Sequence, residues 1–376
     1  MKYYIICGER SGDLHAANLA KSILKFDDNA QFRYLGGEHL ASVVGEAYQF
    51  LHYKNISFML LSQVILNIRK ISKILNLTLH DIKTYKPHAL ILIDSSGFNL
   101  QIAKKIKPYK IPIHYYISPK IWAWNQMRVN AIKKLIDHMY VIIPFEKDFY
   151  KTFDYDVDYV GNPILDAIQG FKPNNRFIQE NNLDSKPIIA ILPGSRYQEV
   201  KGTLPLIVKF SKKYPQFQFV VAGVKNLPLP LYQNLLDSNP QIKLIFEQTY
   251  DLLYNAYAAI VTSGTATLET ALFKVPQVVV YHTHTLTYYI AKFMLKIKYI
   301  SLVNLIADRP IVKELIYKDF NINNLNIEFL KLLNNEERAK ILEDYDKLKN
   351  IIGEPGASDR CAALIVSRIK QNCPNS

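Results

Sequence analysis

The chain has 376 residues, of which 49% are hydrophobic and 21% are charged. This is the balance of an ordinary globular protein, so it excludes a disordered chain, and the length suffices for two domains with full cores. The formal net charge of +13 suits nucleic acid, an anionic membrane surface or anionic substrates as partners, and composition alone does not choose among the three.

The chain gives no clear sign of targeting, metal binding or nucleic-acid binding. Its first apolar run, Tyr3–Cys7, is too short for a signal peptide, and no later segment reaches about 18 uninterrupted apolar residues, so we expect a cytoplasmic protein. Cys7, Cys361 and Cys373 lack metal or disulfide spacing, which predicts reduced thiols, no metal site and no cofactor. The lack of zinc-finger, RNP-type or homeodomain patterns argues against a nucleic-acid module.

The first half alternates apolar strand patterns with helical patterns, which predicts a parallel α/β domain. The expected strands are Tyr3–Cys7, Phe32–Leu35, Ala89–Ile93, Ile113–Ile117 and Met139–Ile143. The expected helices include Leu14–Leu24, Leu100–Ile106 and Val129–Ile136. A stretch rich in Gly, Pro and Asn at 161–174 interrupts the pattern and predicts a linker.

A second α/β series follows this linker. Its expected strands are Ile188–Leu192, Phe217–Ala222, Ile242–Phe246, Ala258–Thr262 and Val278–Tyr281, and its helices include Leu204–Tyr214 and Thr267–Phe273. The charged tail breaks at 353–356 and ends in a helix, Asp359–Ile369, that Ser358 can cap. We therefore expect an N-terminal domain at 1–162, a C-terminal domain at 163–340, and helices at 341–376 that cross back.

One sequence pattern occurs three times: an apolar run is followed by a Gly turn and then by a helix. The three segments begin at Tyr3, Ile188 and Ala258. Gly lets the backbone leave the strand sharply, and the amino end of the helix attracts anions. One copy alone is a weak signal, but copies in both halves indicate two doubly wound Rossmann-like domains facing a ligand cleft. With a C-terminal helix able to pack back on the N-terminal half, this is the GT-B architecture of nucleotide-sugar glycosyltransferases.

Motifs along nearly the whole chain resemble one enzyme family. They are GERSGDLHAANL at 8–19, SPKIWAWNQMRVNAIKK at 118–134, PFEKDFY at 144–150, YVGNPILDA at 159–167, ILPGSRYQEV at 191–200, SGTATLETAL at 263–272, KYISLVNLIADRPIVKEL at 298–315 and GASDRCAA at 356–363. In this order they resemble lipid-A-disaccharide synthase. The sequence departs from the family pattern at Arg10, Gly97 and Val303, and Gly97 leaves Asp94 as the only carboxylate of its loop.

The resemblance implies an inverting glycosyltransferase of lipid A and lipopolysaccharide biosynthesis in a Gram-negative bacterium. The donor would be UDP-2,3-diacylglucosamine, the acceptor 2,3-diacylglucosamine 1-phosphate, and the products a β-1,6-linked disaccharide 1-phosphate and UDP. Such a reaction needs a base for the attacking hydroxyl, positive charge for the departing diphosphate and an apolar place for acyl chains.

Two aspartates are candidates for the base. Asp94 follows the expected strand Ala89–Ile93, at the strand end where an α/β cleft places chemistry, and Asp13 lies at the entry to the first helix. Either could instead be structural, Asp13 at a helix dipole and Asp94 as a helix cap. The residues alone leave the choice open, and the resemblance places Asp94 first. The candidates for acceptor binding are Gly8, Glu9, Ser11, Gly12, His15 and Asn99.

The two Gly turns of the second half are candidates for binding the nucleotide sugar. Gly194 and Ser195 offer hydrogen-bond donors, and Arg196 offers a catalytic forked charge for phosphate, although a surface pair with Glu199 is the alternative. In the next turn, Glu269 is either a ribose ligand or a plain first-turn residue favoured by the helix dipole. The expected diphosphate contacts in that turn are Ser263, Gly264 and Thr265.

Two apolar segments and several lysine clusters are candidates for contact with lipid. Ile56–Ile68 and Leu286–Leu295 are each either a core helix or an acyl groove and membrane-dipping element. Trp122 and Trp124 would point the same way on a strand as interfacial anchors, or lie in the core within a motif loop. The lysines favour an anionic membrane surface, hence a peripheral enzyme on the cytoplasmic face of the inner membrane, with a solvated face as the alternative for any one cluster. These are Lys104, Lys105, Lys107, Lys110, Lys133, Lys134, Lys292, Lys296 and Lys298.

Two other functions are open from the sequence. A UDP-N-acetylglucosamine epimerase on the same architecture explains both nucleotide turns but neither the basic, apolar surface nor the order of the motifs. A nucleic-acid-binding protein explains only the net charge, so we expect no nucleic-acid partner. The sequence does not fix the oligomeric state, and a homodimer is one option.

Overall fold

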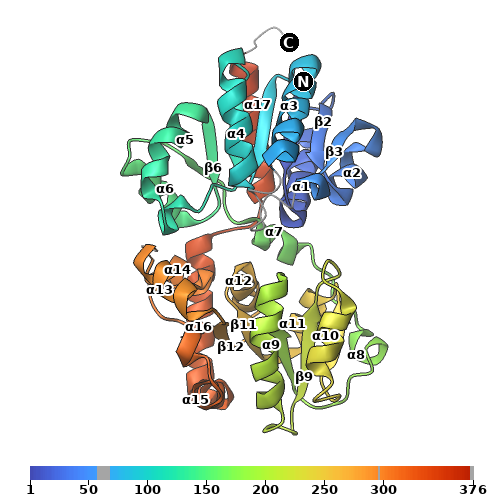
Figure 1. Ribbon diagram of the computed structural model, residues 1–376, viewed down its shortest axis with the longest axis vertical. Helices are drawn as coiled ribbons and strands as arrows, with labels where there is room; N and C mark the ends of the chain where they lie inside the picture. Colours follow the sequence, from blue (N-terminus) through green and yellow to red (C-terminus); the bar gives the residue numbers. More distant parts are fainter. Residues whose placement is uncertain (57–67, 295–296, 373–376) are drawn as a thin grey trace. The chain divides into compact units, whose positions relative to one another are not determined.

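The computed structural model describes residues 1–56, 68–294 and 297–372 (Figure 1). The chain forms two compact units. The first joins Met1–Asp166 to Glu354–Ser376, and the second is Ala167–Gly353, so the chain passes from one unit to the other within helix α7 (Pro163–Gln169) and again just after helix α16. Among the helices of these described residues, none combines the length and the apolar character that a membrane crossing requires.

The first unit is built on a seven-stranded parallel sheet with the order β3-β2-β1-β4-β5-β6-β7. Its strands are β1 Lys2–Cys7, β2 Gln31–Gly36, β3 Gln49–His52, β4 Ala89–Ile93, β5 Ile113–Tyr116, β6 His138–Val141 and β7 Asp158–Tyr159. Its helices are α1 Arg10–Phe26, α2 Glu38–Val44, α3 Ile68–Tyr85, α4 Ser96–Ile106, α5 Val129–Leu135, α6 Pro144–Lys151 and α17 Ala357–Asn372.

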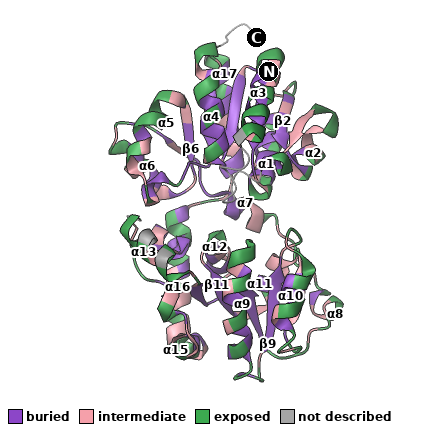
Figure 2. Ribbon diagram, in the orientation of Figure 1, coloured by how far each residue is buried: buried purple, intermediate pink, exposed green. Residues whose placement is uncertain are grey.

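Helices cover both faces of this sheet, because each crossover between parallel strands carries the chain over one face. Successive residues of a strand point to opposite faces, so Tyr3 and Ile5 belong to one apolar cluster and Tyr4 and Ile6 to another. The strands are therefore buried on both sides, whereas the helices expose their outer surfaces (Figure 2). This arrangement explains why the strands read as uninterrupted apolar runs.

The second unit repeats the plan with a six-stranded parallel sheet in the order β10-β9-β8-β11-β12-β13. Its strands are β8 Ile188–Leu192, β9 Gln218–Gly223, β10 Lys243–Phe246, β11 Ala256–Thr262, β12 Gln277–Tyr281 and β13 Lys313–Ile316. Its helices are α8 Phe177–Glu180, α9 Tyr197–Ser211, α10 Leu229–Leu236, α11 Thr249–Asn255, α12 Thr265–Leu272, α13 Thr285–Met294, α14 Leu302–Ala307, α15 Ile322–Leu333 and α16 Asn335–Ile352.

The predicted α/β class and all ten predicted strands are confirmed, with strand ends shifted by at most two residues. Strands β3, β7 and β13 were missed, and the predicted linker contains helix α7. The predicted bounds Leu204–Tyr214 are wrong, because α9 begins at Tyr197 and carries Pro205 in its interior. Trp122 and Trp124 do not lie on a strand: β5 ends at Tyr116, and a 3-10 turn follows at Ile121–Ala123.

Helix α17 is held in the first unit by side chains far away in the sequence. Ser358 does not cap it, since the helix begins at Ala357. Instead the Asp166 carboxylate accepts hydrogen bonds from the amides of Gly356 at 2.5 Å, Ala357 at 3.2 Å and Ser358 at 3.1 Å. This carboxylate satisfies amides that the helix itself leaves unpaired, and its charge opposes the helix dipole.

Arg360 fixes the same junction from within α17. Its guanidinium donates to the carbonyl oxygens of Val160 at 2.8 Å, Pro355 at 2.8 Å and Glu354 at 2.9 Å. Gly161 has a φ of +90°, which strains any other residue, and a Cβ atom there would lie 2.2 Å from the Arg360 Nη2 atom and displace it. The motifs at 159–167 and 356–363 are therefore joined by hydrogen bonds.

We predict that Asp166→Ala lowers the free energy of unfolding by about 1–2 kcal/mol, the usual cost of removing a helix cap. Urea unfolding followed by circular dichroism measures this change. Asp156→Ala is the control, because Asp156 is an exposed carboxylate of the same unit. Equal stabilities of the two variants would contradict the capping role.

Candidate functional site

The predicted site residues gather at two points, one in each sheet. In the first sheet β1 lies between β2 and β4, so the loops after β1 and β4 lead to helices on opposite faces and leave a crevice at the carboxyl ends of the strands. In the second sheet β8 and β11 are the corresponding pair. These switch points are where α/β sheets bind ligands.

The loop after β1 lies close against the turn after β4. A Cβ atom on Gly8 would lie 2.4 Å from the Ser95 Oγ atom, and one on Gly12 would lie 3.3 Å from the Cys7 Cβ atom. Glycine at position 8 is therefore a packing requirement. It brings the segment that contains Glu9, Ser11 and Gly12 next to the turn of Asp94.

Asp13 is fully buried at the start of α1, and both of its carboxylate oxygens accept backbone hydrogen bonds. Oδ1 accepts from the Gly37 amide at 2.6 Å, and Oδ2 accepts from the His39 amide at 2.9 Å. These amides belong to the amino end of α2, where a negative charge is favourable. Asp13 thus joins α1 to α2. The structural alternative in the sequence analysis placed its charge at the dipole of α1, and the structure places it at the amino end of α2.

The turn after β4 has an unusual backbone. Asp94 and Ser95 have φ angles of +48° and +39°, the left-handed region that costs a non-glycine residue about 1 kcal/mol or more. The Tyr115 hydroxyl donates to the Asp94 carbonyl oxygen, and the buried Asn99 amide nitrogen donates to the same oxygen at 2.9 Å and to that of Ile93 at 3.1 Å. Asn99, predicted to bind the acceptor, holds the turn that carries Asp94.

His15 lies one helical turn into α1 and is only partly exposed. Burial lowers the pKa of His15 to about 4, although the Asp166 charge opposes this shift. The imidazole is therefore neutral at physiological pH, and it can offer a hydrogen bond to a substrate but no positive charge.

The loop after β8 is closed by Glu199. Gly194 has a φ of +103°, and the Glu199 Oε2 atom accepts from the amides of Ser195 at 3.0 Å and Arg196 at 3.2 Å. The Arg196 Nη1 atom donates to Glu199 Oε1 at 3.1 Å, the surface pair that the sequence left as an alternative. The Arg196 side chain is 74% exposed, and such exposed pairs contribute less than about 1 kcal/mol, so the guanidinium can move to a ligand at little cost.

In the turn after β11, Gly264 and Thr265 are exposed at the amino end of α12. The Ser263 hydroxyl donates to the Ile300 carbonyl oxygen at 2.7 Å, so it supports the turn. Tyr250 donates to Glu269 Oε1 at 2.9 Å, and burial raises the pKa of Glu269. Glu269 is thus a partly exposed carboxylate whose Oε1 atom accepts from a neutral partner, and within the described part of the chain its Oε2 atom accepts no hydrogen bond.

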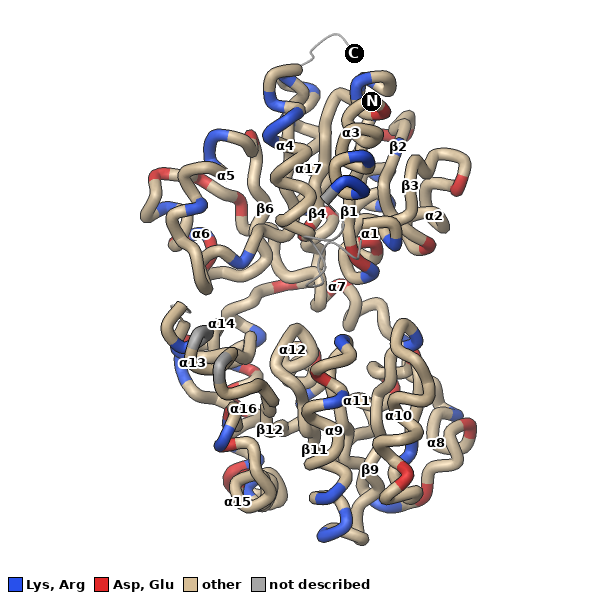
Figure 3. Tube along the Cα trace, in the orientation of Figure 1, with Lys and Arg blue, Asp and Glu red and all other residues tan. Residues whose placement is uncertain are grey.

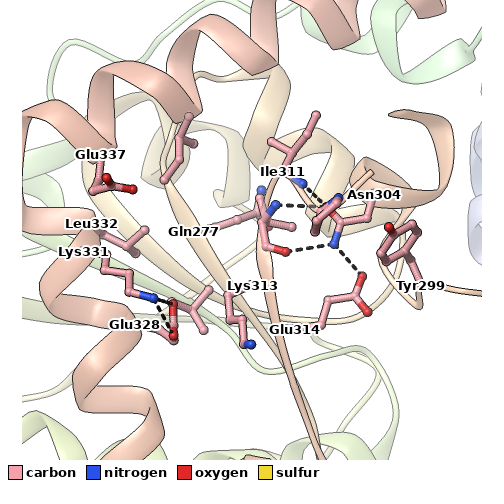
Figure 4. A pocket seen from close by; sticks show the side chains of 14 residues that line it. Gln277, Tyr299, Asn304, Ile311, Lys313, Glu314, Glu328, Lys331, Leu332 and Glu337 are labelled. Atoms are coloured by element: carbon pink, nitrogen blue, oxygen red, sulfur yellow. Dashed lines mark hydrogen bonds and ion pairs between the residues drawn. The ribbon is translucent and has the colours of Figure 1, made fainter. Parts of the chain in front are cut away.

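Asn304 and Glu314, which the sequence analysis missed, form a hydrogen-bonded network (Figure 4) that holds residue 300, the partner of Ser263. Glu314 accepts from the amides of Ile300 at 2.9 Å and Ser301 at 3.0 Å. Asn304 donates to Glu314 Oε1 at 2.9 Å, and its Oδ1 atom accepts from the amides of residues 311 and 312. Both side chains line a pocket of about 370 Å³ at the amino ends of β12 and β13, the opposite end of the sheet from the Gly turns. Asn304 and Glu314 both belong to the motif at 298–315, and their presence in that motif was the signal that could have identified them.

No group of three or more His, Cys, Asp or Glu side chains that could hold a metal ion occurs within residues 1–56, 68–294 and 297–372. The groups that the two switch points offer are carboxylates, a guanidinium, hydroxyls and helix amino ends. They can bind anions and hydroxyl groups and accept a proton.

Known proteins match this chain over most of its length. The family model described as lipid-A-disaccharide synthetase matches residues 3–366. The chain is 33% identical over 376 residues to lipid-A-disaccharide synthase of Syntrophus aciditrophicus, with 98% of each chain covered, and 33% identical over 367 residues to that of Coxiella burnetii (strain CbuG_Q212), with 96% of each covered. Among solved structures, UDP-GlcNAc 2-epimerase from Neisseria meningitidis bound to UDP-GlcNAc has a TM-score of 0.68 at 17% identity, covering 99% of this chain and 100% of that one.

Two Rossmann-like units with Gly turns at both switch points give the chain the GT-B fold. The likeness to the epimerase shows this fold alone. The family match and the two relatives decide the rest: the chain belongs to the lipid-A-disaccharide synthase family and is a glycosyltransferase of lipid A biosynthesis. The family uses a UDP-sugar donor and a lipid acceptor.

His15 gives the stability of the protein a pH dependence. Unfolding returns its pKa from about 4 toward the ordinary value, so the unfolded chain binds more protons and is favoured as the pH falls below about 6.5. We predict that His15→Gln removes about 2 kcal/mol of the stability loss between pH 7 and pH 5. Urea unfolding at both pH values measures it, with exposed His80→Gln as the control. Parallel pH slopes for the wild type and His15→Gln would refute it.

Proposed function

We propose that the chain transfers 2,3-diacylglucosamine from its UDP derivative to the 6-hydroxyl of 2,3-diacylglucosamine 1-phosphate, with inversion at the anomeric carbon. The observation that carries this proposal is the family match over residues 3–366. The structure supports it with candidate loops at both switch points, an acidic one in the first unit and an anion-binding one in the second.

In this proposal the acceptor hydroxyl binds beside Asp94. Its oxygen attacks the anomeric carbon of the donor, the bond from that carbon to UDP breaks, and Asp94 takes the hydroxyl proton. The fixed backbone of the Asp94 turn supports this assignment, because a base must be held within hydrogen-bond reach of its proton. Asp13 positions the neighbouring helices, since its oxygens already accept backbone amides.

The departing diphosphate would be bound in the second unit. Arg196 would leave Glu199 for the phosphates, and Ser195, Gly264 and Thr265 would add neutral donors. Glu269 would accept the ribose hydroxyls. These groups stabilise negative charge as it develops on the leaving group.

Mass spectrometry of a reaction with both acylated glucosamines tests the function. A disaccharide 1-phosphate together with UDP supports the proposal, and its absence with a folded protein overturns it. Incubation with UDP-N-acetylglucosamine alone tests the epimerase alternative, which predicts a 2-epimer.

Asp94→Asn tests the base. The amide keeps the size of the side chain but cannot accept a proton, so we predict a fall in single-turnover rate of about 100-fold to 10,000-fold with UDP-sugar affinity retained. Asp13→Asn should mainly lower stability, because it places an amide NH₂ group against backbone N–H donors. A near-normal rate in Asp94→Asn with a collapsed rate in a folded Asp13→Asn would reverse the two assignments.

We also propose peripheral association with the cytoplasmic face of an anionic inner membrane. Lys and Arg residues follow the adjacent helices α3 and α4 (Figure 3), and Lys105 donates to Asn76 across them at 3.4 Å. Helix α13 adds an exposed apolar face in the second unit, where the Phe293 and Tyr289 side chains are 93% and 57% exposed beside Lys292. The segment at 57–67 lies outside the described residues.

We predict that Lys104→Gln combined with Lys105→Gln weakens binding to phosphatidylglycerol vesicles by about 1 kcal/mol per charge at low salt. Phe293→Ser should instead remove a part of the binding that salt does not weaken. Vesicle flotation across a salt series separates the two contributions, with Lys340→Gln on α16 as the control. Full binding by all the variants would contradict both surfaces.

A further inference from the structure

The loop after β5, residues 118–128, lies at the carboxyl ends of the strands, as Asp94 does. Strands β4 and β5 are parallel neighbours with Ile93 opposite Tyr116, and the Asp94 amide donates to the Tyr116 carbonyl oxygen at 3.1 Å. The loop carries Lys120 and Arg128 and contains no acidic residue. A positively charged loop therefore adjoins the turn of the proposed base.

This loop is held rigidly by one buried carboxylate. Glu146 at the start of α6 accepts from the Ser118 hydroxyl at 2.6 Å and from the Trp122 Nε1 atom at 3.1 Å. The Trp122 ring is buried and meets the Phe145 ring edge to face, with 4.9 Å between centroids. Side chains displayed further along the loop are thus preorganised, which lowers the cost of ligand binding.

Arg128 is half-buried at the end of the loop. Its guanidinium makes no hydrogen bond or ion pair within the described residues, and it lies 5.5 Å from the centre of the Trp124 ring, which is 42% exposed. A partly desolvated cation without a carboxylate is a ready partner for an anionic ligand.

Arg128 and Asp94 also act on one common group. Burial raises the pKa of the Tyr115 hydroxyl, the Asp94 charge raises it further, and the Arg128 charge lowers it. Both charges therefore act on the phenol that donates to the Asp94 carbonyl oxygen.

We infer that Arg128 binds the phosphate monoester of the sugar acceptor, with the exposed Trp124 face against the sugar, while the attacking hydroxyl lies at Asp94. This inference rests on the proposed function, and it assigns the acceptor phosphate to a residue outside the Gly turns. A guanidinium fork matches two phosphate oxygens, and an aromatic face suits the apolar face of a pyranose.

Paired acceptors test the inference: 2,3-diacylglucosamine with and without its 1-phosphate. Arg128→Gln should raise KM for the phosphorylated acceptor by about 10-fold to 100-fold and leave KM for the unphosphorylated acceptor and for the UDP-sugar unchanged. Arg128→Lys should fall between Arg128→Gln and the wild type, because it keeps the charge and loses the fork. Lys151→Gln, which removes an exposed charge from the end of α6, should behave as wild type.

A binding titration separates this inference from the proposed function. The phosphorylated acceptor should change the fluorescence of Trp124, and Arg128→Gln should weaken that titration with or without turnover. If the wild type binds in this way but forms no disaccharide, the proposed function is wrong and the inference about Arg128 still holds. Equal losses for both acceptors in folded Arg128→Gln and Arg128→Lys, or a wild type indifferent to the phosphate, would overturn the inference.

Discussion

One interaction recurs at five junctions of this structure: a carboxylate accepts hydrogen bonds from two or more backbone amides. It fixes the start of α2, the start of α6, the start of α9, the start of α17 and the segment at 300–301 that supports the turn after β11. Each carboxylate satisfies donors that the secondary structure leaves unpaired, and most also oppose a helix dipole. The five residues are Asp13, Glu146, Glu199, Asp166 and Glu314.

This shared role changes how the acidic residues of the site are interpreted. An Asp or Glu beside a Gly turn invites a catalytic assignment, yet Asp13 is engaged by amides of another helix and Glu199 by amides of its own turn. The same contacts hold the loops that carry the proposed positions of Asp94 and Arg196. An acidic residue at a Gly turn is therefore not catalytic by its position alone.

The sequence predicted the buried strands well, because a strand covered on both faces is a plain apolar run. The missed strands lack that signal: β3 is only half-buried, β7 has two residues, and β13 begins with Lys313 and Glu314. The start of α9 was predicted seven residues late, and Pro205, a residue typical of the first helical turn, lies inside this helix. The Gly turns located both switch points, but the Asp166 cap joins residues 190 positions apart, which no local pattern reports.

The second unit is an insertion within the first, because the chain leaves the first unit at α7 and returns to it at 354. The hydrogen bonds from the start of α17 to Asp166 join the two ends of the first unit's chain. Helix α17 also supplies Cys361, Ile365 and Ile369 to an apolar cluster that contains Tyr3 and Ile5. On the ribosome this helix emerges only after the whole of the second unit. The unit that begins first is thus completed last, and until then the part of its apolar sheet face that α17 covers stays exposed to solvent.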